Sequence, residues 1–197
     1  MRASFGRRRI DRLCPGILLL LATAVLMTGC SGGDPVSALC EKLQDADPEV
    51  RYDAAKALEE LGAKAEGAVP VLAEALADED PDVRYRSAKA LSEIGSKIDD
   101  AVPALAQALK DEDADFRYCV AKALDNAGQK AEPALTALIK AMQAEKESGI
   151  RYYLVKSLGK IGPAAQAAIP ALEQAARDPD QKIQDVAASA LKRIRPE

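Results

Sequence analysis

The sequence contains no histidine and no tryptophan, and only 4% of its 197 residues are aromatic. The absence of His removes the commonest metal ligand and general base of proteins. None of the four cysteines, Cys14, Cys30, Cys40 and Cys119, can therefore have a His partner for nucleophilic catalysis. We expect a protein that is not an enzyme and that binds no metal and no cofactor.

Ala and Leu are abundant instead, within a hydrophobic fraction of 48%. These residues favour helices that pack closely, and no pattern for a β-sheet is present. The sequence therefore predicts an all-α fold.

The first 29 residues have the composition of a secretory signal peptide. Five Arg and one Asp lie among the first twelve residues, and Ile17–Met27 is an apolar run too short to span a bilayer comfortably. Small residues then precede Cys30, and the flexible Ser31-Gly32-Gly33 follows it. We expect residues 1–29 to be a signal peptide and residues 30–34 to be a tether.

The segment Leu26-Met27-Thr28-Gly29-Cys30 resembles the lipobox of bacterial lipoproteins, with Met27 where Leu is usual. The resemblance implies that Cys30 is lipidated and becomes the new N-terminus. The protein would then be anchored by lipid to a bacterial membrane in the cell envelope, facing the periplasm or the surface. The alternative is an ordinary signal peptide with an incidental Cys.

Cleavage at this point changes the net charge of the chain. Beyond residue 29 the sequence carries 22 basic and 30 acidic side chains, a net charge of −8. An acidic body argues against nucleic acid as a partner and against electrostatic adhesion to anionic lipid.

The rest of the chain is made of near-copies of one segment. The copies recur every 33 residues, or 34 in one case, at Asp45–Gly62, Asp78–Gly95, Asp111–Gly128, Glu145–Gly162 and Asp178–Arg195. A fixed period of this size predicts a solenoid of helix pairs. We expect a repeat domain over residues 35–197, with repeats at about 35–68, 69–101, 102–134, 135–168 and 169–197.

Each repeat shows two amphipathic helices. The first, or A, helices are predicted to start at Val36, Val69, Val102, Leu135 and Ile169. The second, or B, helices follow an acidic turn, and a Gly ends four of the five. Cys40 lies on the apolar stripe of the first A helix and Cys119 two repeats further on. We therefore expect two buried or half-buried thiols and not a disulfide.

The pattern V-R-Y-x-x-A-K-A-L-x-x-[IL]-G after an Asp-Pro turn resembles the HEAT repeat, in the short form also found in phycobilisome-lyase-type proteins. The resemblance covers residues 34–194. It implies an α-solenoid of about five helix pairs whose B helices line the concave surface. Such a fold suits a scaffold or adaptor that binds a protein partner. The alternatives are a bilin lyase, a HEAT-type hydroxylase, whose iron is held by His-Glu pairs, or a purely structural envelope protein.

The resemblance also implies a structural ladder between neighbouring repeats. Its members are an Asp and an Arg six residues apart, in the pairs Asp45/Arg51, Asp78/Arg84 and Asp111/Arg117. Charge-assisted bonds of this kind are strong when partly desolvated. We expect Glu145/Arg151 to weaken the ladder and Asp178/Gln184 to break it.

A stripe of Tyr and Lys lies opposite the apolar face of the B helices and is the candidate protein-binding face. Its members are Tyr52, Lys56, Tyr85, Lys89, Tyr118, Lys122, Tyr152 and Lys156, and Tyr153 adds aromatic area at the fourth repeat. Tyr and Lys four residues apart share one helix face, and Tyr is a favoured contact residue at interfaces. The alternative is that the tyrosines are merely inherited with the repeats or pack between neighbouring B helices.

Overall fold

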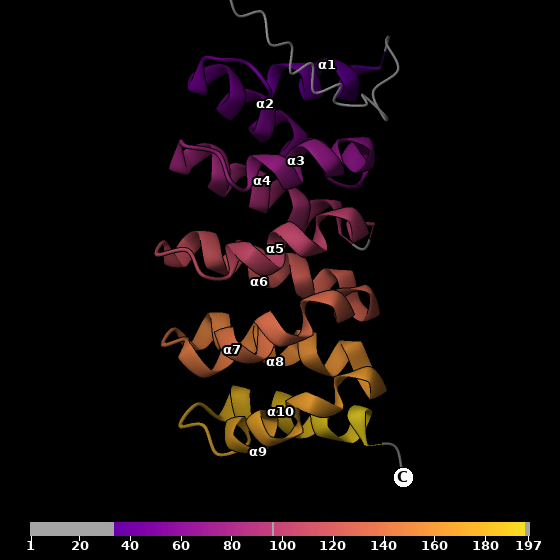
Figure 1. Cartoon of the computed structure of the whole chain (residues 1–197), viewed down its shortest axis with the longest axis vertical. Helices are drawn as coiled ribbons and strands as arrows, with labels where there is room; N and C mark the ends of the chain where they lie inside the picture. The colour runs from indigo at the N-terminus through magenta and orange to yellow at the C-terminus, as the bar shows by residue number, and fades with distance from the viewer. Residues whose placement is uncertain (1–33, 96, 196–197) are drawn as a thin grey trace, which may run out of the picture.

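The computed structural model describes residues 34–95 and 97–195, and Figure 1 shows the arrangement of the helices as a stack of pairs. The predicted signal peptide, the lipidation site Cys30 and all of the tether except Asp34 lie outside the described residues. The A helices are α1 (Pro35–Lys42), α3 (Val69–Ala75), α5 (Val102–Ala108), α7 (Leu135–Ala144) and α9 (Ile169–Ala175). The B helices are α2 (Pro48–Leu61), α4 (Pro81–Ile94), α6 (Ala114–Ala127), α8 (Ser148–Ile161) and α10 (Gln181–Ile194).

The residues at the ends of the B helices explain where these helices begin and stop. Asp47, Asp80, Asp113 and Asp180 precede four of them, and each side chain accepts a hydrogen bond from a backbone N–H of the first turn. Gly62, Gly95, Gly128 and Gly162 follow four of them with φ between 53° and 92°, a conformation that favours glycine.

Short 3₁₀ segments lead from each B helix to the next A helix. They are η1 (Gly62–Ala68), η2 (Asp99–Ala101), η3 (Gly128–Ala134) and η4 (Gly162–Ala168). The sequence pattern alone did not predict them. Their alanines Ala65, Ala101, Ala131 and Ala165 are buried, so each segment covers the core between two repeats.

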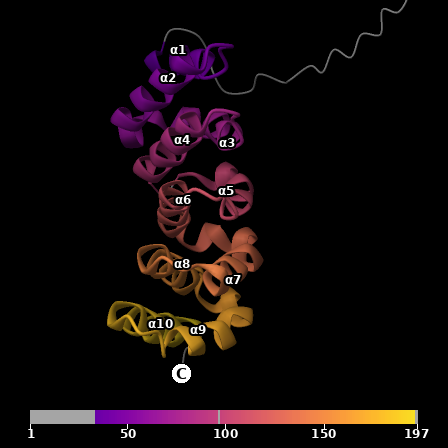
Figure 2. The same ribbon diagram turned by 90° about the vertical axis from the view of Figure 1, so that its left-hand side faces the viewer.

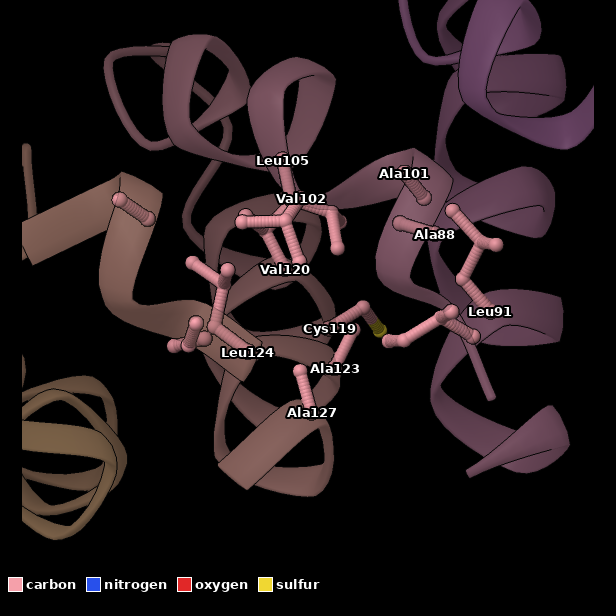
Figure 3. Close-up of a cluster of buried hydrophobic side chains, with 14 of the residues drawn as sticks. Ala88, Leu91, Ala101, Val102, Leu105, Cys119, Val120, Ala123, Leu124 and Ala127 are labelled. Atoms are coloured by element: carbon pink, nitrogen blue, oxygen red, sulfur yellow. The ribbon is translucent and has the colours of Figure 1, made fainter. Parts of the chain in front are cut away.

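One continuous core runs through the stack. The A helices bury Leu72, Leu105, Leu138 and Leu172, and the B helices bury Leu58, Leu91, Leu124 and Leu158. Figure 3 shows how α4 contributes Leu91 and α6 contributes Cys119 to the space between two repeats. Cys40 and Cys119 are both buried, as expected for small hydrophobic side chains.

Figure 2 shows the stack from the side, with the B helices along one flank and the A helices along the other. The flank of the B helices is the inner side of a gentle curve and is called the concave face below. The described residues are helical throughout their regular structure, so the predicted all-α solenoid of helix pairs is confirmed. No helix in the described part of the chain has the length and apolar character needed to cross a membrane.

Candidate functional site

The Asp/Arg ladder lies at the edge of the stack where the A helices turn into the B helices. Arg51 donates to both carboxylate oxygens of Asp78 in the next repeat, with Nε to Oδ2 at 2.7 Å and Nη2 to Oδ1 at 2.8 Å. Its third nitrogen, Nη1, donates to the backbone carbonyls of Asp45 and Ala46, at 2.9 and 3.1 Å. One guanidinium thus closes its own turn and joins it to the turn of the following repeat.

The same arrangement recurs down the stack. Arg84 lies 3.4 Å from the carboxylate of Asp111, and Arg117 donates to both oxygens of Glu145 at 2.8 and 3.1 Å. Arg151 then donates to both oxygens of Asp178 at 3.1 and 3.2 Å. The expectation that Glu145 and Arg151 weaken the ladder is wrong, because each makes a bidentate pair with a neighbouring repeat.

The ladder ends at the last repeat. The Gln184 amide donates to the backbone carbonyl of Asp178 at 2.8 Å, which closes the final turn but reaches no further carboxylate. In each of the first four repeats the Arg contacts the backbone of the acid of its own turn, an Asp or, in the fourth, Glu145, and its carboxylate partner belongs to the next repeat. Removing Arg84 therefore leaves the carboxylate of Asp111 unpaired, whereas that of Asp78 keeps its partner Arg51.

The ladder also affects the ionisation of its carboxylates. Burial by itself disfavours the charged form of Asp78 and Glu145, but hydrogen bonds from Arg51 and Arg117 and from backbone N–H groups outweigh it. The pKa of each carboxylate is therefore lower than its ordinary value. These groups are charged, paired and largely inaccessible at neutral pH, so their role is structural.

A second ladder crosses the concave face and was missed by the sequence analysis. Lys89 and Arg86 both contact Glu59 of the preceding B helix, at 2.8 and 3.0 Å. Lys122 contacts Glu93 at 2.8 Å in the same way. The available signal was an acid three or four residues after three of the four predicted lysines, at Glu59, Glu93 and Asp125, a spacing that puts it on the same helix face as the Lys.

The third step of this second ladder involves one carboxylate and two cations. Lys156 lies 3.1 Å and Lys160 2.9 Å from the carboxylate of Asp125, whose side chain is only 3% exposed. Lys56 stands in α2, and within the described residues no B helix precedes α2 to supply an acid. It is exposed and forms no ion pair within the described ranges.

The predicted Tyr–Lys stripe falls into two different environments. In the first two repeats, the Tyr52 hydroxyl accepts hydrogen bonds from Arg86 Nε at 3.1 Å and Nη2 at 2.8 Å. The Arg86 guanidinium also lies 5.1 Å from the centre of the Tyr52 ring and 5.9 Å from that of Tyr85. Tyr52 and Tyr85 are half-buried, so in these repeats the tyrosines pack between neighbouring B helices.

Tyr118, Tyr152 and Tyr153 form an aromatic cluster at the third and fourth repeats. The Tyr118 and Tyr153 rings meet edge to face with centroids 5.3 Å apart, and those of Tyr152 and Tyr153 do so at 5.4 Å. Lys156 Nζ lies 5.8 Å from the Tyr152 ring centre and 5.5 Å from that of Tyr153. Tyr118 remains 39% exposed, more than any other large hydrophobic side chain in the described residues.

The aromatic cluster forms one wall of a groove on the concave face. The groove has a volume of about 710 Å³ and lies across the N-terminal halves of α8 and α10. Lys182, Asp185 and Val186 of α10 form the opposite wall. A hydrogen bond with Tyr118 is the main cause, and burial the second, that raises the pKa of Tyr153 to about 12. The cluster thus offers ring faces and tyrosine hydroxyls to any chain segment that enters the groove.

Comparisons with known proteins agree with this architecture. Residues 36–124 match the family model described as HEAT repeats, and residues 150–178 match the one described as PBS lyase HEAT-like repeat. No curated protein matches the chain.

Several solved structures have the same fold. A crystal structure of an engineered protein is 26% identical with a TM-score of 0.70, over 82% of this chain and 80% of its own. A designed armadillo repeat protein in complex with the peptide (KR)4 is 21% identical with a TM-score of 0.72, over 81% and 82%. The complex of CpcE and CpcF of phycocyanin lyase from Nostoc sp. PCC7120 is 26% identical with a TM-score of 0.64, over 93% and 71%.

Proposed function

We propose that this chain, a HEAT-repeat protein, is a membrane-anchored scaffold that binds a segment of a protein partner along its concave face. The observation that carries the proposal is the groove beside Tyr118, Tyr152 and Tyr153. Tyrosine is enriched among the residues that dominate binding energy at interfaces, because it offers a large amphipathic surface with few rotatable bonds.

The shape of the groove suits an extended peptide. Its lining residues come from the third, fourth and fifth repeats, and it is open to solvent rather than closed around a small molecule. Helical repeat proteins use such extended concave surfaces for binding. A similar structure is that of designed armadillo repeat proteins made for modular peptide recognition, which supports this use of the shape.

The binding residues are tested by variants that separate binding from packing. Tyr118→Ala should weaken partner capture by about 2 kcal/mol, roughly 30-fold, as loss of a central aromatic contact does. Its unfolding midpoint should change little, because the side chain is the most exposed of the tyrosine stripe. Tyr52→Ala is the matched control, since it removes the same side chain from the first repeat, where the hydroxyl accepts two hydrogen bonds from Arg86.

The assay is quantitative pull-down from detergent-solubilised envelopes, with an unfolding midpoint for each variant. The proposal expects lost capture for Tyr118→Ala and a lowered midpoint with normal capture per folded molecule for Tyr52→Ala. If Tyr118→Ala instead lowers the midpoint and leaves capture intact, the aromatic cluster is packing and the binding face is withdrawn.

The anchor and its location are part of the same proposal. They rest on the lipobox-like Leu26–Cys30, which implies lipid on Cys30 and a place in the bacterial cell envelope. Stable anchoring takes two lipid chains where one gives only reversible binding. Cys30→Ser should abolish incorporation of labelled fatty acid and leave the unprocessed precursor. A wild-type chain that takes up no label would refute the lipoprotein assignment.

We also propose that the scaffold has no catalytic activity of its own. The alternative of a pigment lyase is raised by the similarity to the phycocyanin lyase complex, which covers 93% of this chain. The same pull-down distinguishes the two, because a lyase would be recovered with a bound pigment and its visible absorbance. One stoichiometric protein partner without pigment supports the scaffold.

A further inference from the structure

Charge is distributed unevenly along the B helices. Helix α2 contains two basic and four acidic residues, α4 three and two, and α6 two of each. Helix α8 contains three basic residues and no acidic one, and α10 three and one. The chain beyond residue 29 has a net charge of −8, so the last two B helices are positively charged within an acidic protein.

Most of this positive charge faces the concave side. Arg151 is taken up by the ladder at the other edge, where it pairs with Asp178. The remaining five cations are called the basic face: Lys156, Lys160, Lys182, Lys192 and Arg193. Helical periodicity places each of them on the same half of the helix circumference as Tyr152 in α8, or as the residue that corresponds to Tyr152 in α10. Lys182, Lys192 and Arg193 are exposed and form no ion pair within residues 34–95 and 97–195.

The basic face is short of acids for a structural reason. The position that holds Glu59, Ser92 and Asp125 in the first three B helices is Gly159 in the fourth. A Cβ at Gly159 would lie 2.8 Å from the Cβ of Ala190, so α8 and α10 pack too closely there for an acidic side chain. At this position α8 therefore has no carboxylate that could pair with the cations of the last repeat.

The acids that remain nearby do not neutralise the basic face. Asp125 is shared between Lys156 and Lys160, which leaves one of these two charges uncompensated. Asp180 caps α10 by accepting the Lys182 backbone N–H at 2.9 Å, and Asp185 accepts the amide of Gln181 at 2.9 Å. Five cations thus face three carboxylates, an excess of two positive charges on the concave sides of α8 and α10. Of the five, Lys182 lines the groove itself, together with Asp180 and Asp185.

Favourable interaction with the helix dipole does not explain this arrangement. Lys192 and Arg193 lie in the last turn of α10, where a cation is stabilised by the helix dipole. Lys182 lies in the first turn of the same helix, where the dipole disfavours a cation. An exposed lysine at that position, on the wall of the aromatic groove, calls for a different explanation.

We infer that the partner segment is acidic: an extended peptide whose Asp or Glu side chains meet the basic face while an apolar or aromatic side chain lies against Tyr118, Tyr152 and Tyr153. The inference rests on the proposed function and names the chemistry of its partner. The positive charge of the basic face, and not the net charge of the whole chain, is the supporting observation, because opposite charges in contact set specificity and association rate. The tyrosine hydroxyls of the aromatic cluster can also donate to a carboxylate.

The test uses the full-length chain purified in detergent and a displayed library of random 12-residue peptides. Selected peptides are synthesised with a fluorophore, and their affinity is measured by anisotropy against four forms of the protein. These are the wild type, Tyr118→Ala, the reversal pair Lys182→Glu with Arg193→Glu, and a control pair, Lys42→Glu with Lys64→Glu. The control pair reverses two exposed lysines at the opposite end of the stack.

We expect the selected peptides to be rich in Asp and Glu and to lose affinity at least tenfold with Tyr118→Ala and with the reversal pair. The control pair should change the affinity less than twofold, and replacing Glu by Gln in a peptide should weaken it as the reversal pair does. Binding should also fall as the salt concentration rises.

Three results would overturn the inference. If the peptides lose affinity with Tyr118→Ala but the reversal pair and the control pair change their affinity equally, the proposed function stands and the partner is not acidic. A selection that gives no peptide dependent on Tyr118 would contradict the proposed function as well. The third result is a selection without acidic peptides, together with binding to phosphatidylglycerol vesicles that the reversal pair abolishes and the control pair does not. That result would assign the basic face to a membrane surface instead.

Discussion

The Asp/Arg ladder leads to a quantitative prediction at the junction between the third and fourth repeats. Replacing Arg117 by Ala removes two hydrogen bonds to Glu145 and two to the backbone carbonyls of Asp111 and Glu112. The Glu145 side chain is only 6% exposed, so the change leaves a nearly buried carboxylate without its cation.

Removing one partner of a buried ion pair costs about 3–5 kcal/mol. Glu145 still accepts hydrogen bonds from the backbone N–H groups of Lys146 and Glu147, which places the expected loss near the lower end, at about 3 kcal/mol. For a domain of this size such a loss lowers the unfolding midpoint by roughly 6–12 °C.

Gln184→Ala is the matched control. Gln184 is the residue of the last repeat that corresponds to Arg117, and its side chain makes one hydrogen bond, to the carbonyl of Asp178. Its loss should cost about 1 kcal/mol. Thermal unfolding followed by circular dichroism measures both variants, and hydrogen exchange should show earlier opening of α7 to α10 only in Arg117→Ala, because repeats are coupled through their interfaces. Equal losses in the two variants would refute the ladder as an inter-repeat connection.

Three further predictions follow from the packing and the charges. Gly159→Ala should lower the free energy of unfolding by about 1–3 kcal/mol, because the new Cβ would clash with Ala190. Gly149→Ala should raise it by up to about 1 kcal/mol, because a Cβ there would lie 3.8 Å from its nearest neighbour. Thermal melts in which Gly149→Ala is the less stable variant would contradict the close packing of α8 on α10. Ser157→Ala should stabilise the protein by about 1 kcal/mol in denaturant titration, because the buried hydroxyl has no hydrogen-bond partner in the described residues; a destabilised variant would contradict this. The pKa of Asp78 and Glu145 is lowered from 3.8 and 4.5, so their contribution to stability is complete above pH 4.5 and is lost as the pH falls through the lower folded values; an unfolding midpoint that stays constant from pH 6 to pH 2.5 would contradict it.

The sequence predicted the repeated architecture because that information is local. The acidic turns and the Gly that ends four of the five B helices are read within single repeats, and the 33-residue period is read by comparing the copies along the chain. The A helices α3, α5, α7 and α9 begin at the predicted residues. The 3₁₀ segments were missed because they follow no apolar period of their own. They form where small buried side chains, such as those of Ala65 and Ala131, allow one repeat to pack closely against the next.

The candidate site was predicted less completely because its character depends on neighbours in other repeats. The Tyr–Lys stripe is uniform in sequence, but the residue after each Tyr differs, and it decides the environment. Arg86 stands there in the second repeat and binds Tyr52, whereas Tyr153 stands there in the fourth and extends the aromatic cluster. Ion pairs join Lys89, Lys122 and Lys156 to carboxylates on the preceding B helix. Residue spacing within one repeat does not reveal such pairs between repeats.

Site-specific photo-crosslinking in intact cells tests the central claim, binding of a partner on the concave face, most directly. A benzophenone amino acid replaces Tyr118 in one strain and the exposed Gln107 of α5, on the opposite flank, in another. The account predicts one discrete protein adduct from position 118 and none of that mass from position 107. The same adduct from both positions, or from position 107 alone, would contradict a partner bound on the concave face.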